Sequence, residues 1–239
     1  MLTGSLAIAR REWVAAFGRP LAWGVLALFV ASFGLLTLWY DDWFLSGVAS
    51  LRGPLSWLSG CLLLLVPATT MRAFAEDQRT GAWQVLHALP VTPTALVVGK
   101  WLGALGVCGG AILLTAPWPL ALAWIGEPDP GPLLGGYLGV ALSASALSAI
   151  GIAASALFDS QVLAYLVALV AGGAPWLVGR ALPLVPAPLV PWVERLGAEH
   201  HVAELARGVI DVGSVVYFLA ITALALRLAI HRVEHRRLA

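Results

Sequence analysis

Residues 130–158 read PGPLLGGYLGVALSASALSAIGIAASALF and contain no charged side chain. A membrane-spanning helix needs about 20 consecutive apolar residues, so this stretch alone is long enough to cross a bilayer. Similar charge-free stretches lie at 20–40, 53–71, 101–126, 160–179 and 212–226. The chain of 239 residues is 60% apolar and only 11% charged, whereas about a quarter of the residues of a soluble domain are charged. The sequence therefore predicts an all-α polytopic membrane protein with six transmembrane helices. It excludes a soluble enzyme, a secreted disulfide scaffold and, because the runs are continuous rather than alternating, a spanning β-barrel.

The stretches between these runs divide one membrane domain, residues 1–239, into spans and connections. The predicted spans are 20–40, 54–71, 95–125, 132–158, 160–180 and 212–230. Residues 1–19 carry apolar side chains at helical spacing on one side, which predicts a helix lying in the membrane interface; a cytosolic helix without membrane contact is the alternative. Residues 72–94 are predicted to form a cytoplasmic segment. Residues 181–211 form an outer segment that begins ALPLVPAPLVPWV, and its prolines favour a re-entrant or interfacial structure over a seventh span.

Several residues give local signals at the ends and in the middle of the spans. Thr92 and Pro93 predict the cap and first turn of span three, and Asp159 can cap span five. Kinked or loosened helices are expected in spans three and five. The residues concerned are Pro117 and Pro119 in span three, and Gly172, Gly173 and Pro175 in span five.

The basic residues fall unequally on the two sides of a six-span chain. One side receives Arg10, Arg11, Arg19, Arg72, Arg79, Lys100, Arg227, Arg232, Arg236 and Arg237, and the other receives only Arg52, Arg180, Arg195 and Arg207. Because cytoplasmic loops are enriched in Lys and Arg, this distribution predicts that both termini are cytoplasmic.

The first five charge-free runs contain no ionisable side chain at membrane depth. Ion-coupled carriers usually keep such a residue, so an ion-coupled carrier is the weakest interpretation, and an intramembrane enzyme is also disfavoured. The chain has no phosphate loop of its own either, because Gly99 and Lys100 lack the earlier glycine of GxxxxGK[ST] and are followed by Trp101. If ATP drives the protein, a separate ATPase has to dock.

Span four carries a small residue at every fourth position for much of its length. Such a row lets two helix backbones approach closely, either within one chain or at a subunit interface. The row consists of Gly131, Gly135, Gly139, Ser143, Gly151 and Ser155. Gly99 and Gly103 form a second, weaker pair of this kind.

The cytoplasmic segment predicts two short helices. Arg72 and Glu76 are four residues apart, and Glu76 and Arg79 are three apart, so span two can continue as a helix into the cytosol. Thr80 and Gly81 interrupt it. A second helix then has an apolar face made by Ala82, Val85, Leu86 and Leu89 and ends at Pro90. A docking partner can push on such a helix; the alternative is a loop helix lying on the lipid surface.

The stretch PATTMRAFAEDQRTGAWQVLHALPVTPTALVVGKWLGAL, residues 67–105, resembles the corresponding part of ABC type 2 exporter permeases, in particular the gliding-motility-like group. The likeness extends over most of the chain. The matching residues are Glu76, Asp77, Arg79, Gly81, Leu86, Pro90, Gly99 and Lys100. The sequence departs from the pattern at Asp77 and Gln84, where Glu is usual, and at Ala82, where Thr is usual.

The resemblance implies a permease subunit of an ATP-driven exporter in a bacterial cytoplasmic membrane. It implies two ABC ATPase subunits, which bind ATP and Mg²⁺, and a second permease chain that is identical or related. It makes residues 72–94 a coupling segment, and the residues expected to couple to the ATPase are Glu76, Asp77, Arg79, Gly81, Ala82, Val85, Leu86, Leu89 and Pro90. The alternative is a membrane anchor or assembly subunit that recruits an ABC ATPase for mechanical work without passing cargo. Whether a periplasmic accessory subunit sits on the outer segment is left open.

The remaining reactive residues predict no catalytic, cofactor or metal site in this chain. Cys61 and Cys108 lie alone in separate apolar runs and are interpreted as small buried hydrophobes. In the outer group Glu199, His200, His201 and Glu204, only His200 and Glu204 share a helix face, which gives two metal ligands and favours a polar cap instead. The sequence contains no basic stripe, so nucleic-acid binding is not predicted.

Overall fold

The computed structural model describes residues 2–18, 20–39, 51–79, 92–126, 128–181, 183 and 185–238. Most of these residues are helical, with no strand among them. In chain order the helices are α1 (Leu2–Phe17), α2 (Pro20–Trp39), α3 (Arg52–Thr70), α4 (Ala75–Arg79), α6 (Pro93–Leu113), α7 (Pro117–Ile125), α8 (Pro130–Leu157), α9 (Gln161–Ala181), η2 (Ala187–Leu189), α10 (Val190–Glu194), α11 (Ala198–Leu205) and α12 (Val212–Leu238). The prediction of an all-helical fold is confirmed for the described part of the chain.

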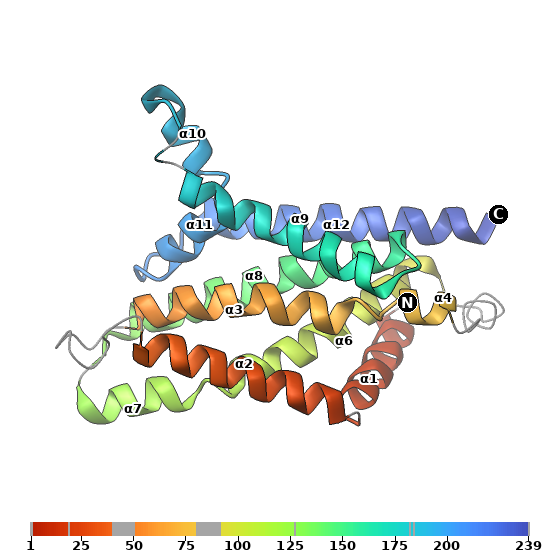
Figure 1. Cartoon of the computed structure of the whole chain (residues 1–239), viewed down its shortest axis with the longest axis horizontal. Helices are drawn as coiled ribbons and strands as arrows, with labels where there is room; N and C mark the ends of the chain where they lie inside the picture. The colour runs from red at the N-terminus through yellow and green to blue at the C-terminus, as the bar shows by residue number, and fades with distance from the viewer. Residues whose placement is uncertain are drawn as a thin grey trace.

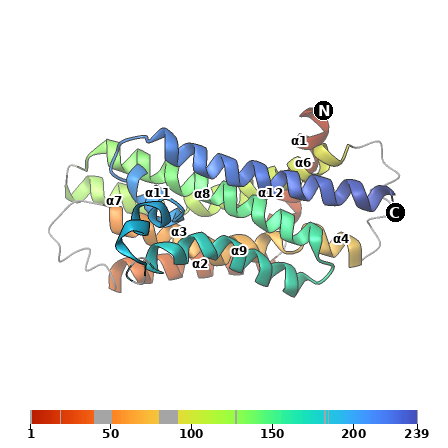
Figure 2. The ribbon, with the colours of Figure 1, turned by 90° about the horizontal axis from the view of Figure 1, so that it is seen from above.

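Six helical stretches are long and apolar enough to cross a membrane, as the sequence predicts. They are Ala22–Trp39, Arg52–Arg79, Pro93–Trp124, Pro130–Leu157, Gln161–Gly179 and Val212–Arg236. These helices run along the long axis of one bundle (Figure 1). Both chain ends, α1 and α4 lie at one end of it, and α7, α10 and α11 lie at the other (Figure 2). We call these the inner end and the outer end, after the predicted orientation.

Helix α8 is the centre of the bundle and is the most deeply buried of the six stretches. It packs against α3, α6, α9, α11 and α12. Its small side chains allow this, because a glycine or serine at the contact lets the next backbone approach. By contrast, α2, α9 and α12 expose rows of large apolar side chains such as Leu35, Leu166 and Leu224. Large exposed apolar surface is expected where lipid replaces water as the solvent.

The predicted cap of span three is confirmed, whereas the predicted cap of span five is wrong. The Thr92 side chain accepts a hydrogen bond from the Ala95 N–H at 3.2 Å, and Pro93 occupies the first turn of α6. Asp159 instead pairs with Arg236 of α12 at 3.0 Å, and the hydroxyl of Ser160 accepts from the Leu163 N–H at 3.4 Å. A carboxylate next to a cation is held by the stronger charge-assisted bond, which leaves the cap to serine.

The two proline-containing spans differ in helix continuity. Helix α6 ends at Leu113 and α7 begins at Pro117, so span three is broken where its prolines fall. Helix α9 continues without interruption through Pro175. A proline inside a membrane helix is tolerated where the helix can adjust locally, and it therefore does not have to end it.

The structure adds detail to the two longer connections. Span two continues towards α4 through a turn at residues 71–74, where the Glu76 N–H donates to the Arg72 carbonyl at 3.2 Å. The second predicted helix of the coupling segment, residues 82–90, lies outside the described residues. At the outer end, the segment expected to be re-entrant or interfacial contains η2, α10 and α11, and α11 packs on α8 and α9.

Candidate functional site

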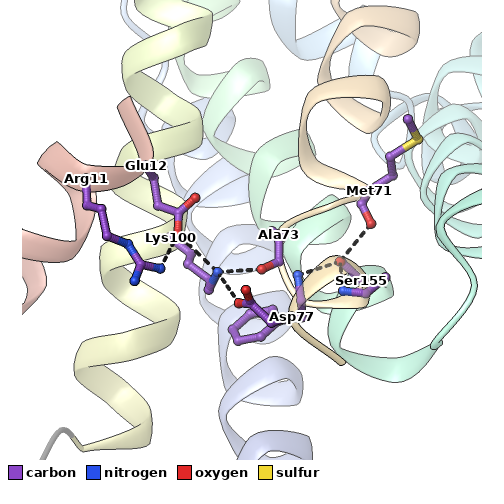
Figure 3. A network of polar contacts seen from close by, with 9 residues as sticks. Arg11, Glu12, Met71, Ala73, Asp77, Lys100 and Ser155 are labelled. Atoms are coloured by element: carbon purple, nitrogen blue, oxygen red, sulfur yellow. Dashed lines mark hydrogen bonds and ion pairs between the residues drawn. The ribbon is translucent and has the colours of Figure 1, made fainter. Parts of the chain in front are cut away.

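The turn between α3 and α4 is fixed to the central helix by one serine. The hydroxyl of Ser155 donates to the Met71 carbonyl at 3.0 Å and accepts from the N–H groups of Phe74 at 2.9 Å and Ala75 at 3.1 Å (Figure 3). A serine hydroxyl has one proton and two lone pairs, so these bonds use its full capacity. Ser155 is completely buried. The start of α4 is therefore attached to α8 by side-chain and backbone groups that have no water to replace them.

Close contact between α3 and α8 brings this turn to the serine. A Cβ built on Gly151 would lie 2.0 Å from Oγ1 of Thr70, the last residue of α3. Only glycine fits at that point. One turn further along α8, Ser155 then meets the chain immediately after α3 ends.

The outer half of the same small-residue row packs against α11 and its following turn. A Cβ at Gly135 would overlap the Leu205 carbonyl, and one at Gly139 would lie 3.3 Å from the Leu205 side chain. Gly131 lies near Gly208, whose φ of +88° favours glycine. Ser143 bonds within its own helix to the Val140 carbonyl. The glycines of the predicted row thus make their close contacts inside one chain.

Lys100 of α6 is the most unusual side chain of the inner end, because it is a cation with only 3% of its surface exposed. Its Nζ lies 3.1 Å from Oε1 of Glu12 on α1 and 2.8 Å from Oδ2 of Asp77 on α4, and it also donates to the Ala73 carbonyl (Figure 3). The ring of Phe74 lies 5.0 Å from the same nitrogen, a distance typical of a cation–π contact. A buried ammonium needs such partners, because an unpaired one is strongly destabilising.

Helix α1 reaches Lys100 because glycines of α6 form a groove for it. A Cβ at Gly99 would lie 2.8 Å from the Cβ of Ile8, and one at Gly103 would lie 2.7 Å from the Cβ of Glu12. The weak Gly99 and Gly103 pair noted in the sequence thus packs against the N-terminal helix rather than another span. Leu6 and Val14 of α1 stay exposed. One face of α1 therefore packs on α6, while apolar side chains remain on its exposed face.

The charges around Lys100 determine the ionisation of Glu12. Burial alone would raise the pKa of Glu12, but the positive charges of Lys100 and Arg11 and their hydrogen bonds outweigh it, so this pKa lies below its ordinary value. Arg11 Nη2 lies 3.1 Å from the same carboxylate oxygen that accepts from Lys100. Glu12 is therefore an ionised bridge between a buried and an exposed cation.

A cavity of about 370 Å³ opens beside this cluster. Its walls come from α1, α2, α3, α4, α6 and α8. Charged side chains line one part, including Arg11, Glu12, Arg72 and Lys100, and small apolar side chains such as Ala22 and Val107 line the rest. Sites for small ligands commonly have this volume and this mixture of apolar wall and few polar groups.

The structure brings together only some of the residues predicted to couple to an ATPase. Glu76, Asp77 and Arg79 lie on α4, and Asp77 is the one that binds Lys100. The side chain of Arg72 forms no ion pair with any described residue, so the expected pair with Glu76 is not made, although the Glu76 N–H still donates to the Arg72 carbonyl at 3.2 Å. The others, Gly81, Ala82, Val85, Leu86, Leu89 and Pro90, lie outside the described residues.

Sequence reasoning missed the two residues that connect this cluster. Glu12 lies on a helix interpreted only by its apolar face, and Ser155 was assigned to a packing row. Lys100 had two sequence signals. It is one of the residues that match the permease pattern, and it is the one charge inside a helix whose following run, residues 101–126, is charge-free. A charge so placed is costly unless it is paired.

At the outer end, His200 and His201 form polar contacts within the chain. Nε2 of His201 donates to the Arg195 carbonyl at 2.8 Å, and Nδ1 lies 3.0 Å from the hydroxyl of Ser214. Nδ1 of His200 lies 3.3 Å from Oε1 of Glu194. Glu204 pairs with Arg207 at 2.8 Å. Within the described ranges, no three potential metal ligands gather in one place.

No family model matches the chain, and no curated protein matches it either. The class is therefore defined by the fold: the described residues form an all-helical bundle in which six helices are long and apolar enough to span a membrane. Its inner end carries a buried lysine bound by two carboxylates beside a mixed polar and apolar cavity.

Proposed function

We propose that the chain is the transmembrane permease subunit of an ATP-driven exporter of the ABC type 2 kind. Its residues 72–94 receive the motion of an ABC ATPase on the cytoplasmic side of a bacterial membrane. The observation that carries the proposal is the attachment of α4, the root of that segment, to three other helices through Lys100 and Ser155. A surface loop without a mechanical role can be anchored without a buried ion pair, which carries a desolvation cost.

The mechanism is a shift between two states of the bundle. An ATPase that closes on ATP binds one position of the coupling segment better than the other, and this differential affinity moves the equilibrium. The segment transmits the shift through Asp77 to Lys100 on α6, and through the turn at residues 71–74 to Ser155 on α8. The chain contributes the path and the lever, while the ATPase partner supplies ATP and Mg²⁺ chemistry. A second permease chain completes the path, and the charge-free spans favour an apolar or amphipathic cargo that leaves outward.

The first test is affinity purification of the chain from its native host in mild detergent, followed by mass spectrometry. Recovery of an ABC ATPase at about one per permease chain is expected. Leu86→Asp places a charge on the predicted docking face and should abolish recovery of the ATPase. His87→Asp introduces the same charge away from the apolar face of Ala82, Val85, Leu86 and Leu89, and should not abolish recovery. An intact preparation without an ATPase, or equal recovery with both variants, refutes the coupling assignment.

A second measurement separates export from anchoring. ATP turnover of the complex in proteoliposomes should rise when a transported amphiphile is added. Turnover that responds only to another envelope protein would instead favour an anchor for mechanical work.

A further inference from the structure

Among the described residues that line the cavity at the inner end, Arg72 is a cation without an ion pair, although the carboxylate of Glu76 lines the same cavity. Lys100 is opposed by Glu12 and Asp77, and Arg11 pairs with Glu12. Arg72 lines the same cavity, yet its side chain forms no hydrogen bond or ion pair with any described residue, and its Nε is buried without a partner. A buried guanidinium nitrogen without an acceptor is costly, because it has lost water and gained nothing. This arginine is therefore available for an anion that enters the cavity.

The cavity changes character along α6. Lys100, Gly103, Ala104 and Val107 line it and lie at positions i, i+3, i+4 and i+7, which form one helix face. Only the first of them is charged. Seven residues correspond to about 10 Å of helix, so an apolar wall of about that length runs from the charged part into the bundle. Ala22 and Val25 of α2 add to the apolar part.

We propose that this cavity binds an amphiphile with an anionic head, such as a phosphate ester, and that Arg72 is the partner of the anion. The apolar chain lies against α2 and α6. The position of the site supports this assignment, because Arg72 follows directly after the apolar run 53–71, at the depth where lipid head groups meet hydrocarbon. Arginine suits the role because its planar group binds phosphate oxygens in pairs.

An anionic amphiphile in this cavity can be a phospholipid of the surrounding bilayer or an amphiphilic cargo. Only its assignment as cargo rests on the proposed function in export. The chain is reconstituted in nanodiscs of phosphatidylcholine that contain a minor fraction of phosphatidylglycerol. Dodecyl phosphate, dodecyl maltoside and inorganic phosphate are then added as competitors. Native mass spectrometry of the purified full-length chain counts the phosphatidylglycerol retained.

The wild-type chain should retain phosphatidylglycerol in preference to phosphatidylcholine. Arg72→Gln should lower that preference about tenfold, the change expected for one lost charge-assisted hydrogen bond. Arg72→Lys keeps the charge and should retain most of the preference. Ala104→Leu fills the apolar part without changing any charge and should also reduce retention. Arg232→Gln alters an exposed arginine of α12 outside the cavity and serves as the matched control.

Displacement of the retained lipid by dodecyl phosphate, but not by dodecyl maltoside, assigns the site to single-chain anionic amphiphiles of the cargo type. If dodecyl phosphate does not displace the lipid, the site is assigned to bilayer phospholipid. If inorganic phosphate displaces the lipid as well as dodecyl phosphate does, the anionic head group alone is sufficient for binding, which overturns the role of the apolar wall. Equal retention of the two lipids, or an Arg72→Gln variant that behaves as wild type while melting normally, overturns the site. A chain that recruits an ATPase but shows no lipid preference would overturn this inference and leave the proposed function standing.

Discussion

Replacing Lys100 with methionine removes the buried charge while keeping a side chain of similar length. The two carboxylates then lose their shared cation. Removing one partner of a buried pair costs about 3–5 kcal/mol. The side chains of Glu12 and Asp77 keep 27% and 19% of their surface exposed, so water compensates part of the loss. We expect the lower end of the range, about 3 kcal/mol. For a chain of this size that corresponds to a fall in melting temperature of about 6–12 °C.

The chain contains its own reporter for this measurement. Cys61 and Cys108 are free and buried, so a maleimide fluorophore reacts with them only when the bundle opens. Melting curves of the wild type, Lys100→Met and the control Arg232→Met can be recorded with the same dye. Glu12→Gln and the double variant complete a cycle, and residues in contact should show a coupling of about 0.5–3 kcal/mol. A Lys100→Met curve within about 2 °C of wild type, or strictly additive effects in the cycle, would refute the assignment of Lys100 as the connection between α1, α4 and α6.

Three further changes test the packing and the electrostatics with the same melting assay. Gly151→Ala should lower the free energy of unfolding by about 1–3 kcal/mol, because the added methyl group would overlap a threonine of α3. The control Gly109→Ala should not lower it, because no atom lies near the position of its Cβ. Equal melting temperatures of the two variants would contradict the contact at Gly151. Ser155→Ala leaves two N–H groups and a carbonyl unsatisfied and should speed amide exchange in the turn at residues 71–74, with unchanged exchange as the contrary result. Burial lowers the pKa of His201 below 6.5, so the unfolded chain binds the proton more readily and stability should fall as pH drops from 7.5 to 5. Asp211 does not contribute in this range, because the hydrogen bonds that lower its pKa below 3.8 contribute stability that is lost only at lower pH. If a His201→Gln variant loses as much stability as the wild type between pH 7.5 and 5, His201 is not the cause of the pH dependence.

The sequence was sufficient for features that depend on neighbouring residues. A charge-free run of about 20 residues in a membrane satisfies its backbone only as a helix, so the six spans follow from composition and length. Thr92 and Pro93 also act locally, because a cap side chain reaches only the first turn of its own helix. The cap expected from Asp159 failed when Arg236, distant in sequence, competed for the carboxylate.

The centre of the candidate site depends on residues far apart in the chain, and no local pattern encodes their meeting. Glu12 and Lys100 are separated by 88 positions, and Ser155 and Met71 by 84. A row of small residues indicates that some backbone approaches closely but does not identify which one. Span four illustrates this: Gly135 meets the end of α11, while Gly151 meets the end of α3.

The two attachments of α4 differ in what they would transmit. Ser155 holds the turn before α4 with three hydrogen bonds to the backbone, so α4 cannot move away from α8 without leaving buried backbone groups unsatisfied. Asp77 holds α4 to Lys100 by a side-chain ion pair, which has rotatable bonds at both ends and is partly exposed on the Asp77 side, and Lys100 also donates to the Ala73 carbonyl of the turn. A force applied to α4 would therefore move the inner end of α8 with it, while both contacts with α6 run through one lysine side chain that can change its rotamer. Helix α8 is also the helix that α3, α9, α11 and α12 pack against, so displacement of its inner end is the change most able to reach the whole bundle.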